Sequence, residues 1–268
     1  MRRFLQMIIM GDDMPTWNAD QYLKFEDERT QPCRDLVARV SLADVRTVID
    51  LGCGPGNSTG VVAERWPGAE ITGLDDSASM IEDARRRQPQ YRWIIQDITR
   101  WASNPSGEMF DLVFSNAALQ WVPNHASLYP QLLARVAPGG AFAVQIPCNL
   151  NSPAQVLMRQ IASPATQVRE WHAHPRDFYY DLLALDSARL DIWETEYLHV
   201  LPNVEAIVEW YKGSGLRPFL EAFDTDSDRT QFLAEYSKRI RDAYPPRPDG
   251  KILFAFRRLF MVAYRKSG

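Results

Sequence analysis

Positive charge is not in excess in this chain of 268 residues, which has 30 lysines and arginines against 34 aspartates and glutamates and a net charge of −4. A nucleic-acid-binding domain normally shows a basic footprint, so we expect no tRNA, rRNA or DNA partner. No apolar run approaches the ~20 residues that a membrane-spanning helix needs, so we expect no membrane association. With 46% hydrophobic and 24% charged residues, the composition is that of an ordinary globular protein.

Cysteine is equally scarce, with Cys33, Cys53 and Cys148 scattered along the chain. They form no disulfide framework, which indicates a reducing compartment, and we expect the cytoplasm. His172 and His174 have no third ligand at a plausible spacing, so we expect no metal site. Cys53 has no visible base partner, and we interpret it as a packing residue rather than a nucleophile.

The first residues combine two arginines with a short apolar run and only faintly imitate a signal peptide, because no small-residue cleavage site follows. We expect residues 1–15 to be a disordered extension, with the true start at Met10 or Met14. The remaining residues, 16–268, fit one large domain with a cap or insertion.

Glycine is concentrated after a short apolar strand, where Gly52, Gly54 and Gly56 stand at alternate positions before a predicted helix. A strand, a glycine turn and a helix place a ligand against bare backbone at the carboxyl end of a parallel strand. Asn57 stands where a dinucleotide fingerprint has its last glycine, and the lysine of a phosphate-binding P-loop is missing. Both kinds of nucleotide site are therefore disfavoured.

Asp50 lies two positions before the first glycine, so the stretch reads D-x-G-x-G-x-G. It resembles motif I of the class I S-adenosylmethionine-dependent methyltransferases, which Asp50, Gly52, Gly54 and Gly56 match residue for residue. The resemblance implies that these residues bind S-adenosylmethionine and that S-adenosylhomocysteine is the product. A turn that binds nothing would not require three glycines, since each adds a cost in backbone entropy.

Apolar runs alternate with amphipathic helical patterns along the first half of the chain, as in a parallel α/β sheet. We predict an α/β fold, a Rossmann-like doubly wound and mostly parallel sheet with a helical cap; an antiparallel last strand is what the resemblance implies. The core should span about 40–148, and the cap about 150–190 and 203–247. The predicted strands are residues 47–51, 70–74, 91–95, 110–114, 141–146, 195–201 and 252–264.

Residues at the predicted strand ends suit successive parts of S-adenosylmethionine, because a doubly wound sheet binds ligands at that edge. A carboxylate at Asp75 can accept hydrogen bonds from both ribose hydroxyls. Asp97 suits the adenine amino group, Ile98 can cover the ring face, and Asn116 suits the methionine end. Further candidates come from an aromatic and charged segment that can close over the ligands as a lid. They are Tyr22 and Arg29.

Segments beyond the glycine stretch are similar to those of one bacterial family in this class, the trans-aconitate 2-methyltransferases. The resemblance implies methyl transfer to one carboxylate of trans-aconitate, which gives a monomethyl ester. A carboxylate is already ionised at neutral pH, with a reference pKa near ~4, so this transfer needs no catalytic base. The similar segments are residues 17–18, 22–32, 50–59, 116–122, 138–140 and 256–260.

A tricarboxylate requires cations, preferably guanidinium groups that bind a carboxylate through two hydrogen bonds. Among the arginines of the predicted cap and last strand, we rank Arg217 first. Arg257 and Arg258 are adjacent on a strand and face opposite ways, so we expect at most one of them, Arg257, in the pocket. Candidates for walls and neutral hydrogen bonds are Trp121, His125 and Tyr211.

Two other functions stay open at this point. One is methyl transfer to another small carboxylic acid or to a malonyl carrier-protein thioester, although the mild acidity argues weakly against a carrier-protein partner. The other is a module that binds S-adenosylmethionine without catalysis. No sequence feature fixes the oligomeric state, so a monomer is the default expectation.

Overall fold

The computed structural model describes residues 26–104, 107–162 and 168–267, with side chains from Thr30 onward. The predicted N-terminal extension and Tyr22 lie outside the described residues, as does the side chain of Arg29. Helix α2 (Glu26–Arg39) is the first described element and leads into the first strand.

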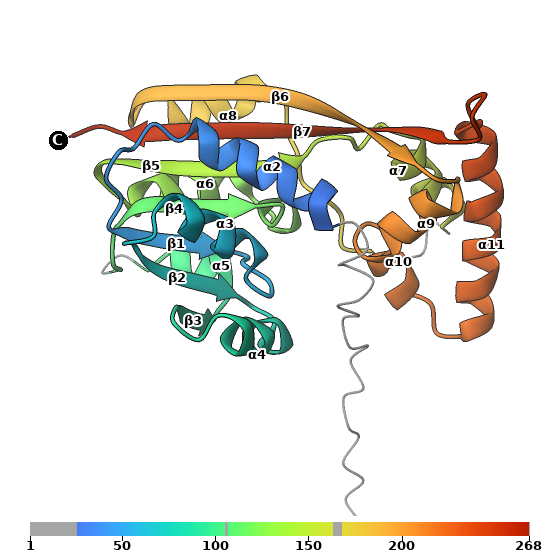
Figure 1. The fold of residues 1–268 in the computed structure, drawn as a ribbon, viewed down its shortest axis with the longest axis horizontal. Coiled ribbons are helices and arrows are strands. Elements are labelled where there is room, and N and C mark those ends of the chain that lie inside the picture. The colour runs from blue at the N-terminus through green and yellow to red at the C-terminus, as the bar shows by residue number, and fades with distance from the viewer. Residues whose placement is uncertain (1–25, 105–106, 163–167, 268) are drawn as a thin grey trace, which may run out of the picture.

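One sheet of seven strands, in the order β3–β2–β1–β4–β5–β7–β6, runs through the described residues (Figure 1). β1 to β5 are parallel, and β7 is antiparallel to both of its neighbours, β5 and β6. The predicted Rossmann-like sheet with an antiparallel last strand is confirmed. The strands are β1 (Thr47–Leu51), β2 (Glu70–Asp75), β3 (Arg92–Ile95), β4 (Phe110–Asn116), β5 (Val136–Pro147), β6 (Ser187–Leu201) and β7 (Ile252–Arg265).

Helices cover both faces of this sheet, because each central strand is apolar on both sides. In β1, Val48 belongs to a buried cluster with Leu36 of α2 and Val62 of α3. The next residue, Ile49, points the other way and belongs to a cluster that includes Leu128 of α6. The helices that follow the first four strands are α3 (Asn57–Arg65), α4 (Ala78–Arg87), α5 (Ile98–Ala102) and α6 (His125–Ala134).

The residues Pro138-Gly139-Gly140 are of the types that commonly end a helix, but in this structure they do not. Helix α6 already ends at Ala134, and the three residues lie inside β5. There the register between β4 and β5 shifts, which is the sign of a bulge, and Gly139 adopts a φ of +79°. The glycine therefore serves a kink in a strand rather than a helix end.

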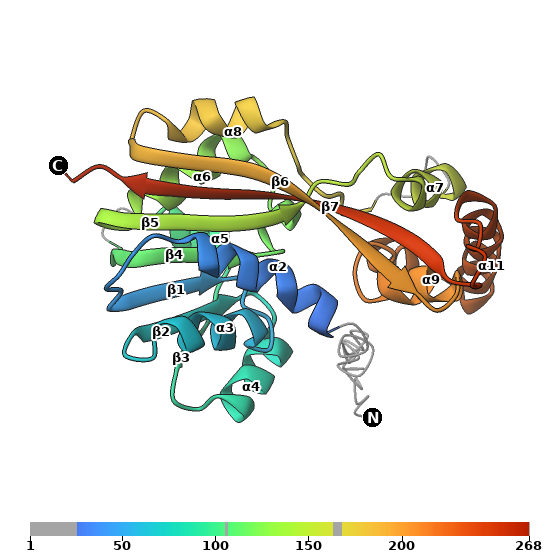
Figure 2. The same cartoon turned by 45° about the horizontal axis from the view of Figure 1, so that its top comes forward.

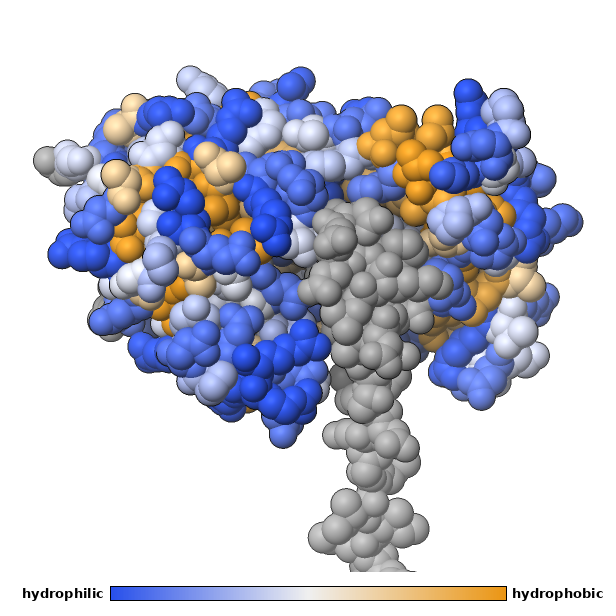
Figure 3. Space-filling model, viewed as in Figure 1, coloured by the Kyte–Doolittle hydropathy of each residue, from blue (hydrophilic) through white to orange (hydrophobic). Residues whose placement is uncertain are grey.

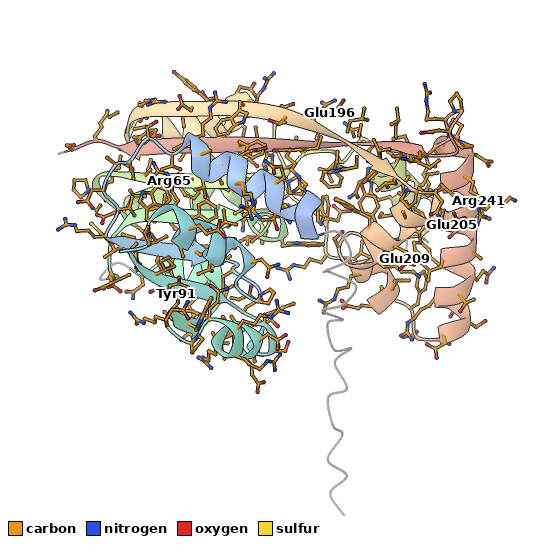
Figure 4. The ribbon with its side chains drawn as sticks, in the orientation of Figure 1. Arg65, Tyr91, Glu196, Glu205, Glu209 and Arg241 are labelled. Atoms are coloured by element: carbon orange, nitrogen blue, oxygen red, sulfur yellow. The ribbon has the colours of Figure 1, made fainter. Side chains whose placement is uncertain are left out.

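β6 and β7 extend well beyond the other strands and carry a second hydrophobic core at their far end (Figure 2). Trp210 and Tyr211 pack their rings against Phe254 of β7, with centroids 5.7 and 5.9 Å apart. Arg241 pairs with Glu205 at 2.8 Å and ties two helices of this unit together (Figure 4). We call this unit the helical cap; its helices are α7 (Pro153–Ile161), α9 (Glu205–Lys212), α10 (Arg217–Glu221) and α11 (Asp226–Ala243).

Helix α8 (Arg176–Leu183) falls in the range 150–190 that the sequence assigned to the cap, but it packs elsewhere. Its residues Tyr179 and Leu183 join the core cluster of the sheet, and the helix contacts α6 and β6. β6 also begins at Ser187, well before the predicted residue 195. An apolar helix face does not reveal which surface will cover it, so the predicted cap was too large here.

The outward face of the cap ends of β6 and β7 stays exposed and apolar. Leu198, Val200 and Leu253 are exposed, and Figure 3 shows hydrophobic surface over these strands. Their alternate neighbours His199 and Phe254 are buried, as the two-residue period of a strand requires. The three exposed side chains therefore add to neither core.

Candidate active site

The glycine turn after β1 is held tightly against its neighbours. The N–H of Gly52 donates to the carbonyl of Leu74 at 2.7 Å, and Gly52 has a φ of +70°. A Cβ here would lie 2.2 Å from the Cβ of Ala118, so no larger residue fits without a backbone shift. Gly54 also has a positive φ, +53°, and its missing side chain would point into open space. The turn thus presents bare backbone to a ligand.

Asp50 and Gly56 complete the predicted motif but do not line the cavity described below. Asp50 is fully buried and accepts hydrogen bonds from the hydroxyls of Ser58 and Thr59, each at 2.7 Å. Gly56 precedes α3 in the left-handed conformation, with a φ of +92°. The two residues hold the first turn of α3 against β1 and so shape the glycine turn.

The free energy of unfolding should depend on pH through the titration of Asp50. Burial raises the pKa of Asp50 from 3.8 to about 6, although the hydroxyls of Thr59 and Ser58 oppose the shift. Because the folded state then binds this proton more tightly than the unfolded state, the contribution of Asp50 is lost as pH rises between about 4 and 6. Relative to Asp50→Asn, the wild type should lose on the order of 2–3 kcal/mol of unfolding free energy across that window. Urea denaturation of both proteins tests this, and parallel profiles would contradict it.

A cavity of about 830 Å³ opens at the carboxyl ends of β1, β2 and β4 and reaches the helical cap. Asp75, at the end of β2, accepts the N–H groups of Gly54 at 3.0 Å and Ser77 at 2.9 Å. Burial raises its pKa, and the two N–H donors partly offset that shift. The predicted cofactor residues that line the cavity are Gly52, Gly54, Asp75, Asp97, Ile98 and Asn116.

Asp97 and Ile98 stand where the chain passes from β3 into α5. Asp97 caps α5 by accepting the N–H of Arg100 at 2.9 Å and the hydroxyl of Thr99. Burial alone would raise the pKa of Asp97, but these hydrogen bonds outweigh it and hold the pKa below its ordinary value. The cavity therefore has a fixed, ionised carboxylate beside the apolar, 8% exposed side chain of Ile98.

Two amides offer buried oxygens in the cavity wall. They belong to Asn116, at the end of β4, and to Gln120 in the short helix η1 (Leu119–Trp121). Neither Oδ1 of Asn116 nor Oε1 of Gln120 has a hydrogen-bond partner among the described residues. A buried acceptor left in this state costs about 1–3 kcal/mol, so a ligand that brings donors would be stabilised here.

The cavity wall also contains three arginines and several aromatic rings. Arg217 begins α10, and its Nε donates to Glu221 at 2.5 Å. Arg169 donates to the carbonyl of Trp121 at 3.0 Å, and its guanidinium lies 5.7 Å from the centre of that ring. Arg258, on β7, is the third arginine of the wall. One cavity thus contains both carboxylates and guanidinium groups.

His125 and Tyr211, which the sequence suggested as pocket walls, are buried outside the cavity. Both ring nitrogens of His125 are engaged, Nδ1 with the hydroxyl of Tyr179 at 2.8 Å and Nε2 with the carbonyl of Leu119 at 2.9 Å. Burial lowers the pKa of His125 to about 4, so it is neutral at physiological pH. The hydroxyl of Tyr211 accepts from Asn149 at 3.1 Å within the cap core. Both side chains are parts of the scaffold.

Arg257 was the wrong choice between the two arginines of β7. Its side chain is 54% exposed and pairs with Glu194 and Glu196 of β6 at 3.9 Å each. Figure 4 labels Glu196 on the outer strand of the sheet. Strand alternation was foreseen correctly, but only the register of β7 against β5 decides which of the two arginines turns to the cavity.

A family model described as a methyltransferase domain matches residues 48–140. A trans-aconitate 2-methyltransferase from Azoarcus sp. strain BH72 is 49% identical over 257 residues, covering 94% of this chain and 100% of that protein. One from Rhodopseudomonas palustris strain BisB18 is 48% identical over 261 residues, with 94% and 100% covered. The chain belongs to the trans-aconitate 2-methyltransferase family.

Solved structures agree with this assignment at the level of the fold. The YcgJ protein from Bacillus subtilis has a TM-score of 0.59 at 13% identity, covering 89% of this chain and 100% of that one. Phosphoethanolamine N-methyltransferase 2 from Haemonchus contortus, in complex with S-adenosyl-L-methionine, has a TM-score of 0.55 at 13% identity, with 88% and 53% covered. As a member of the trans-aconitate 2-methyltransferase family, the chain is an S-adenosylmethionine-dependent methyltransferase, and S-adenosylhomocysteine is its product.

Sequence reasoning missed several cavity residues of this trans-aconitate 2-methyltransferase family member, among them Arg169, Trp171 and Trp210. The rings of Trp121 and Trp171 meet edge to face at 5.6 Å. The N–H of His172 donates to the carbonyl of Gln120 at 2.7 Å, which fixes this segment beside η1. The segment that carries Arg169 and Trp171 has no helical or strand periodicity. In the sequence, only the presence of an arginine and a tryptophan could have indicated that it lines the cavity.

Other chemistry has little support in the part of the chain that the structure describes. Within it, no group of three or more His, Cys, Asp or Glu side chains is arranged to hold a metal ion. None of its helices combines the length and the apolarity that a bilayer crossing requires. Cys33, Cys53 and Cys148 are free, and burial raises the pKa of the Cys148 thiol to about 12, which argues against a reactive thiolate.

Proposed function

We propose that this chain transfers the methyl group of S-adenosylmethionine to one carboxylate of trans-aconitate. The observation that carries the proposal is a single cavity that is lined by the carboxylates of Asp75 and Asp97 and also by three arginines, Arg169, Arg217 and Arg258. Carboxylates suit the hydroxyl and amino groups of an adenosine, and guanidinium groups suit an acid with several carboxylates. Relatives that carry trans-aconitate in their names are 45–49% identical to this chain.

The cavity fits the cofactor in its donors and acceptors. S-adenosylmethionine supplies a methyl group on a positively charged sulfur, which is already electrophilic. The Asp75 carboxylate, which two backbone N–H groups orient, would accept hydrogen bonds from the ribose hydroxyls. Asp97 and Ile98 would hold the adenine, and the buried Oδ1 of Asn116 would accept from the ammonium group. Each of these residues binds and orients, and none takes part in bond breaking.

The acceptor needs alignment and dehydration rather than a base. A carboxylic acid with a pKa near ~4 is already ionised at neutral pH. Trp121, Trp171 and Trp210 line the cavity and provide apolar surface that keeps water from the attacking oxygen. The arginines then fix the acid so that the oxygen faces the methyl group, which converts a bimolecular encounter into an oriented one.

Arg217 can bind the acid at little cost to the free site. Its ion pair with Glu221 joins side chains that are 40% and 43% exposed. Exposed pairs at this helical spacing stabilise a protein by only about 0.3–0.5 kcal/mol. Because Glu221 also lines the cavity, Arg217 can exchange this partner for a substrate carboxylate without leaving the wall.

Substitution of Arg217 separates acid binding from cofactor binding. We expect Arg217→Ala to raise the KM for trans-aconitate by about 30-fold or more, because a charge-assisted pair is lost. The Kd for S-adenosylmethionine, measured by calorimetry, should stay nearly unchanged. Arg239→Ala is the matched control, since Arg239 has the same type of ion pair, with Glu235 at 2.7 Å, but does not line the cavity. Equal loss of acid and cofactor binding would make Arg217 a structural residue.

The proposed function itself is tested by methyl transfer from labelled S-adenosylmethionine to a panel of acids. The panel contains trans-aconitate, cis-aconitate, isocitrate, citrate and a malonyl thioester. We expect selective labelling of trans-aconitate, with the label recovered as a base-labile ester. Labelling of the malonyl thioester alone would overturn the substrate. Tight cofactor binding without transfer to any acid would favour a non-catalytic binding module.

The cellular setting follows from the sequence. We infer a cytoplasmic monomer that acts on a small molecule, without a nucleic-acid or membrane partner. The net charge of −4 and the three free cysteines support this inference. Sedimentation of the purified chain at several concentrations tests the monomer, and a stable dimer would overturn it.

A further inference from the structure

The two adjacent arginines of β7 have opposite surroundings. Arg257 lies on the outward face of the sheet among the glutamates of β6. Arg258 is only 4% exposed and lines the cavity, although both side chains carry the same charge. Consecutive side chains of a strand point to opposite faces, which explains this difference. Arg257 is therefore a matched control for Arg258, because it has the same charge but lies outside the cavity.

The strand register places Arg258 close to the expected methionine end of the cofactor. Asn116 of β4 pairs with Gln145 of β5, and Pro147 of β5 pairs with Arg258 of β7. Neighbouring strands lie about 4.8 Å apart, so roughly 10 Å separates the backbones of β4 and β7. The Nη1 of Arg258 donates to Oε1 of Gln145 at 3.3 Å, which turns the guanidinium back toward β4.

Arg258 packs against aromatic rings and donates to Gln145, and these contacts hold its side chain in one orientation. Its guanidinium lies 4.7 Å from the ring centre of Phe256, another residue of the cavity wall. Nearby, burial and then the charge of Arg258 lower the pKa of His199 to about 4, so that neighbour is neutral. A carboxylate that enters here meets a dehydrated, oriented guanidinium, where a charge-assisted hydrogen bond is stronger than at the surface.

We propose that Arg258 binds a non-reacting carboxylate of the acid while Arg217 binds a second one. The inference rests on the proposed function and names the residues that make the enzyme specific for a tricarboxylate. Arg258 belongs to the sheet and Arg217 to the helical cap, so the acid bridges the two cores. The third carboxylate remains to attack the methyl carbon through an oxygen lone pair, and the sulfur leaves with the electrons of the broken carbon–sulfur bond. A monocarboxylate cannot make this bridge.

The test removes one arginine and one carboxylate at a time. Mesaconate, itaconate and cis-glutaconate each keep two of the three carboxylates of trans-aconitate in their original geometry. The kcat/KM for all four acids is measured with labelled S-adenosylmethionine for the wild type, Arg258→Met and Arg257→Met. Arg258→Met should lower kcat/KM for trans-aconitate by about 30-fold or more. One of the dicarboxylates lacks the carboxylate that Arg258 binds. For this acid, Arg258→Met should lower kcat/KM by less than about threefold, because the contact between Arg258 and that carboxylate is already absent in the wild type.

Two results of the kinetic comparison would overturn the inference. One is the same loss in Arg258→Met and in Arg257→Met, whose side chain lies outside the cavity. The other is a uniform loss on every acid, which would mean that Arg258 does not recognise one particular carboxylate. Calorimetry with S-adenosylmethionine checks the fold of each variant. If Arg258→Met does not bind the cofactor, Arg258→Lys, which keeps the positive charge, takes its place in the comparison. Loss of cofactor binding in both variants also overturns the inference. A wild type that methylates none of the acids overturns the proposed function as well.

Discussion

Replacing Gly52 with alanine is expected to weaken S-adenosylmethionine binding by roughly 100-fold or more and to remove methyl transfer at ordinary cofactor concentrations. Two costs add up at this position. The φ of +70° is unfavourable for any residue with a Cβ, and that atom would lie 2.2 Å from the Cβ of Ala118. Because the Gly52 N–H is anchored to the carbonyl of Leu74, the turn can relieve the overlap only by breaking this bond.

Calorimetric titration with S-adenosylmethionine measures the effect, and thermal unfolding reports how much of the cost falls on the fold. Gly68→Ala is the control, since a Cβ there meets nothing within 4 Å and the backbone has no positive φ. It should leave affinity unchanged. Unchanged cofactor affinity in Gly52→Ala would show that the contact with Ala118 relaxes freely and that the turn is not the cofactor's support.

Asp75→Ala is expected to have the second large effect, a loss of roughly 100-fold or more in affinity for S-adenosylmethionine. Two charge-assisted hydrogen bonds to the ribose would be lost, each contributing about 1.5–3 kcal/mol. The substitution also frees the N–H groups of Gly54 and Ser77, which Asp75 now holds in place. Binding should weaken further at acidic pH in the wild type alone, because burial raises the pKa of Asp75.

The neighbouring carboxylate provides the control for Asp75. Asp76 also lines the cavity but is exposed, so Asp76→Ala should change affinity by less than about fivefold. Equal effects of both substitutions would show that the negative potential of the loop matters more than a specific contact to the ribose. The pH dependence of cofactor binding distinguishes these cases as well, because burial raises the pKa of Asp75.

Local patterns predicted the sheet well because its strands are buried on both faces. The predicted strand 47–51 coincides with β1, and the remaining strands were found with small shifts at their ends, except for the early starts of β5 and β6. The strand-end residues Asp75, Asp97 and Asn116 were also foreseen, since the carboxyl ends of parallel strands meet at one edge.

The acid side was harder to predict, because it depends on contacts between distant parts of the chain. Arg257 and Arg258 are consecutive residues of one strand, so their side chains point to opposite faces of the sheet. The register of β7 against β5 decides which of the two faces the cavity. His125 and Tyr211 look like ligands in the sequence, but their polar atoms are used inside the scaffold. Asp50 belongs to the same motif as the glycines that line the cavity, but it is buried and accepts hydrogen bonds from Ser58 and Thr59 of α3. None of these distinctions has a local signal.

The position of β7 has a consequence for how the protein folds during its synthesis on the ribosome. β7 is the last described element to be synthesised, yet it lies inside the sheet between β5 and β6. The strands that carry the glycine turn and Asp75 can pair early, while β6 and the cap helices emerge before β7, the strand on which they pack. Until residues 252–265 leave the exit tunnel, the edge of β5 and the apolar cap residues stay open to chaperones and to aggregation. The nascent chain should therefore be able to bind its methyl donor before it can hold the acid.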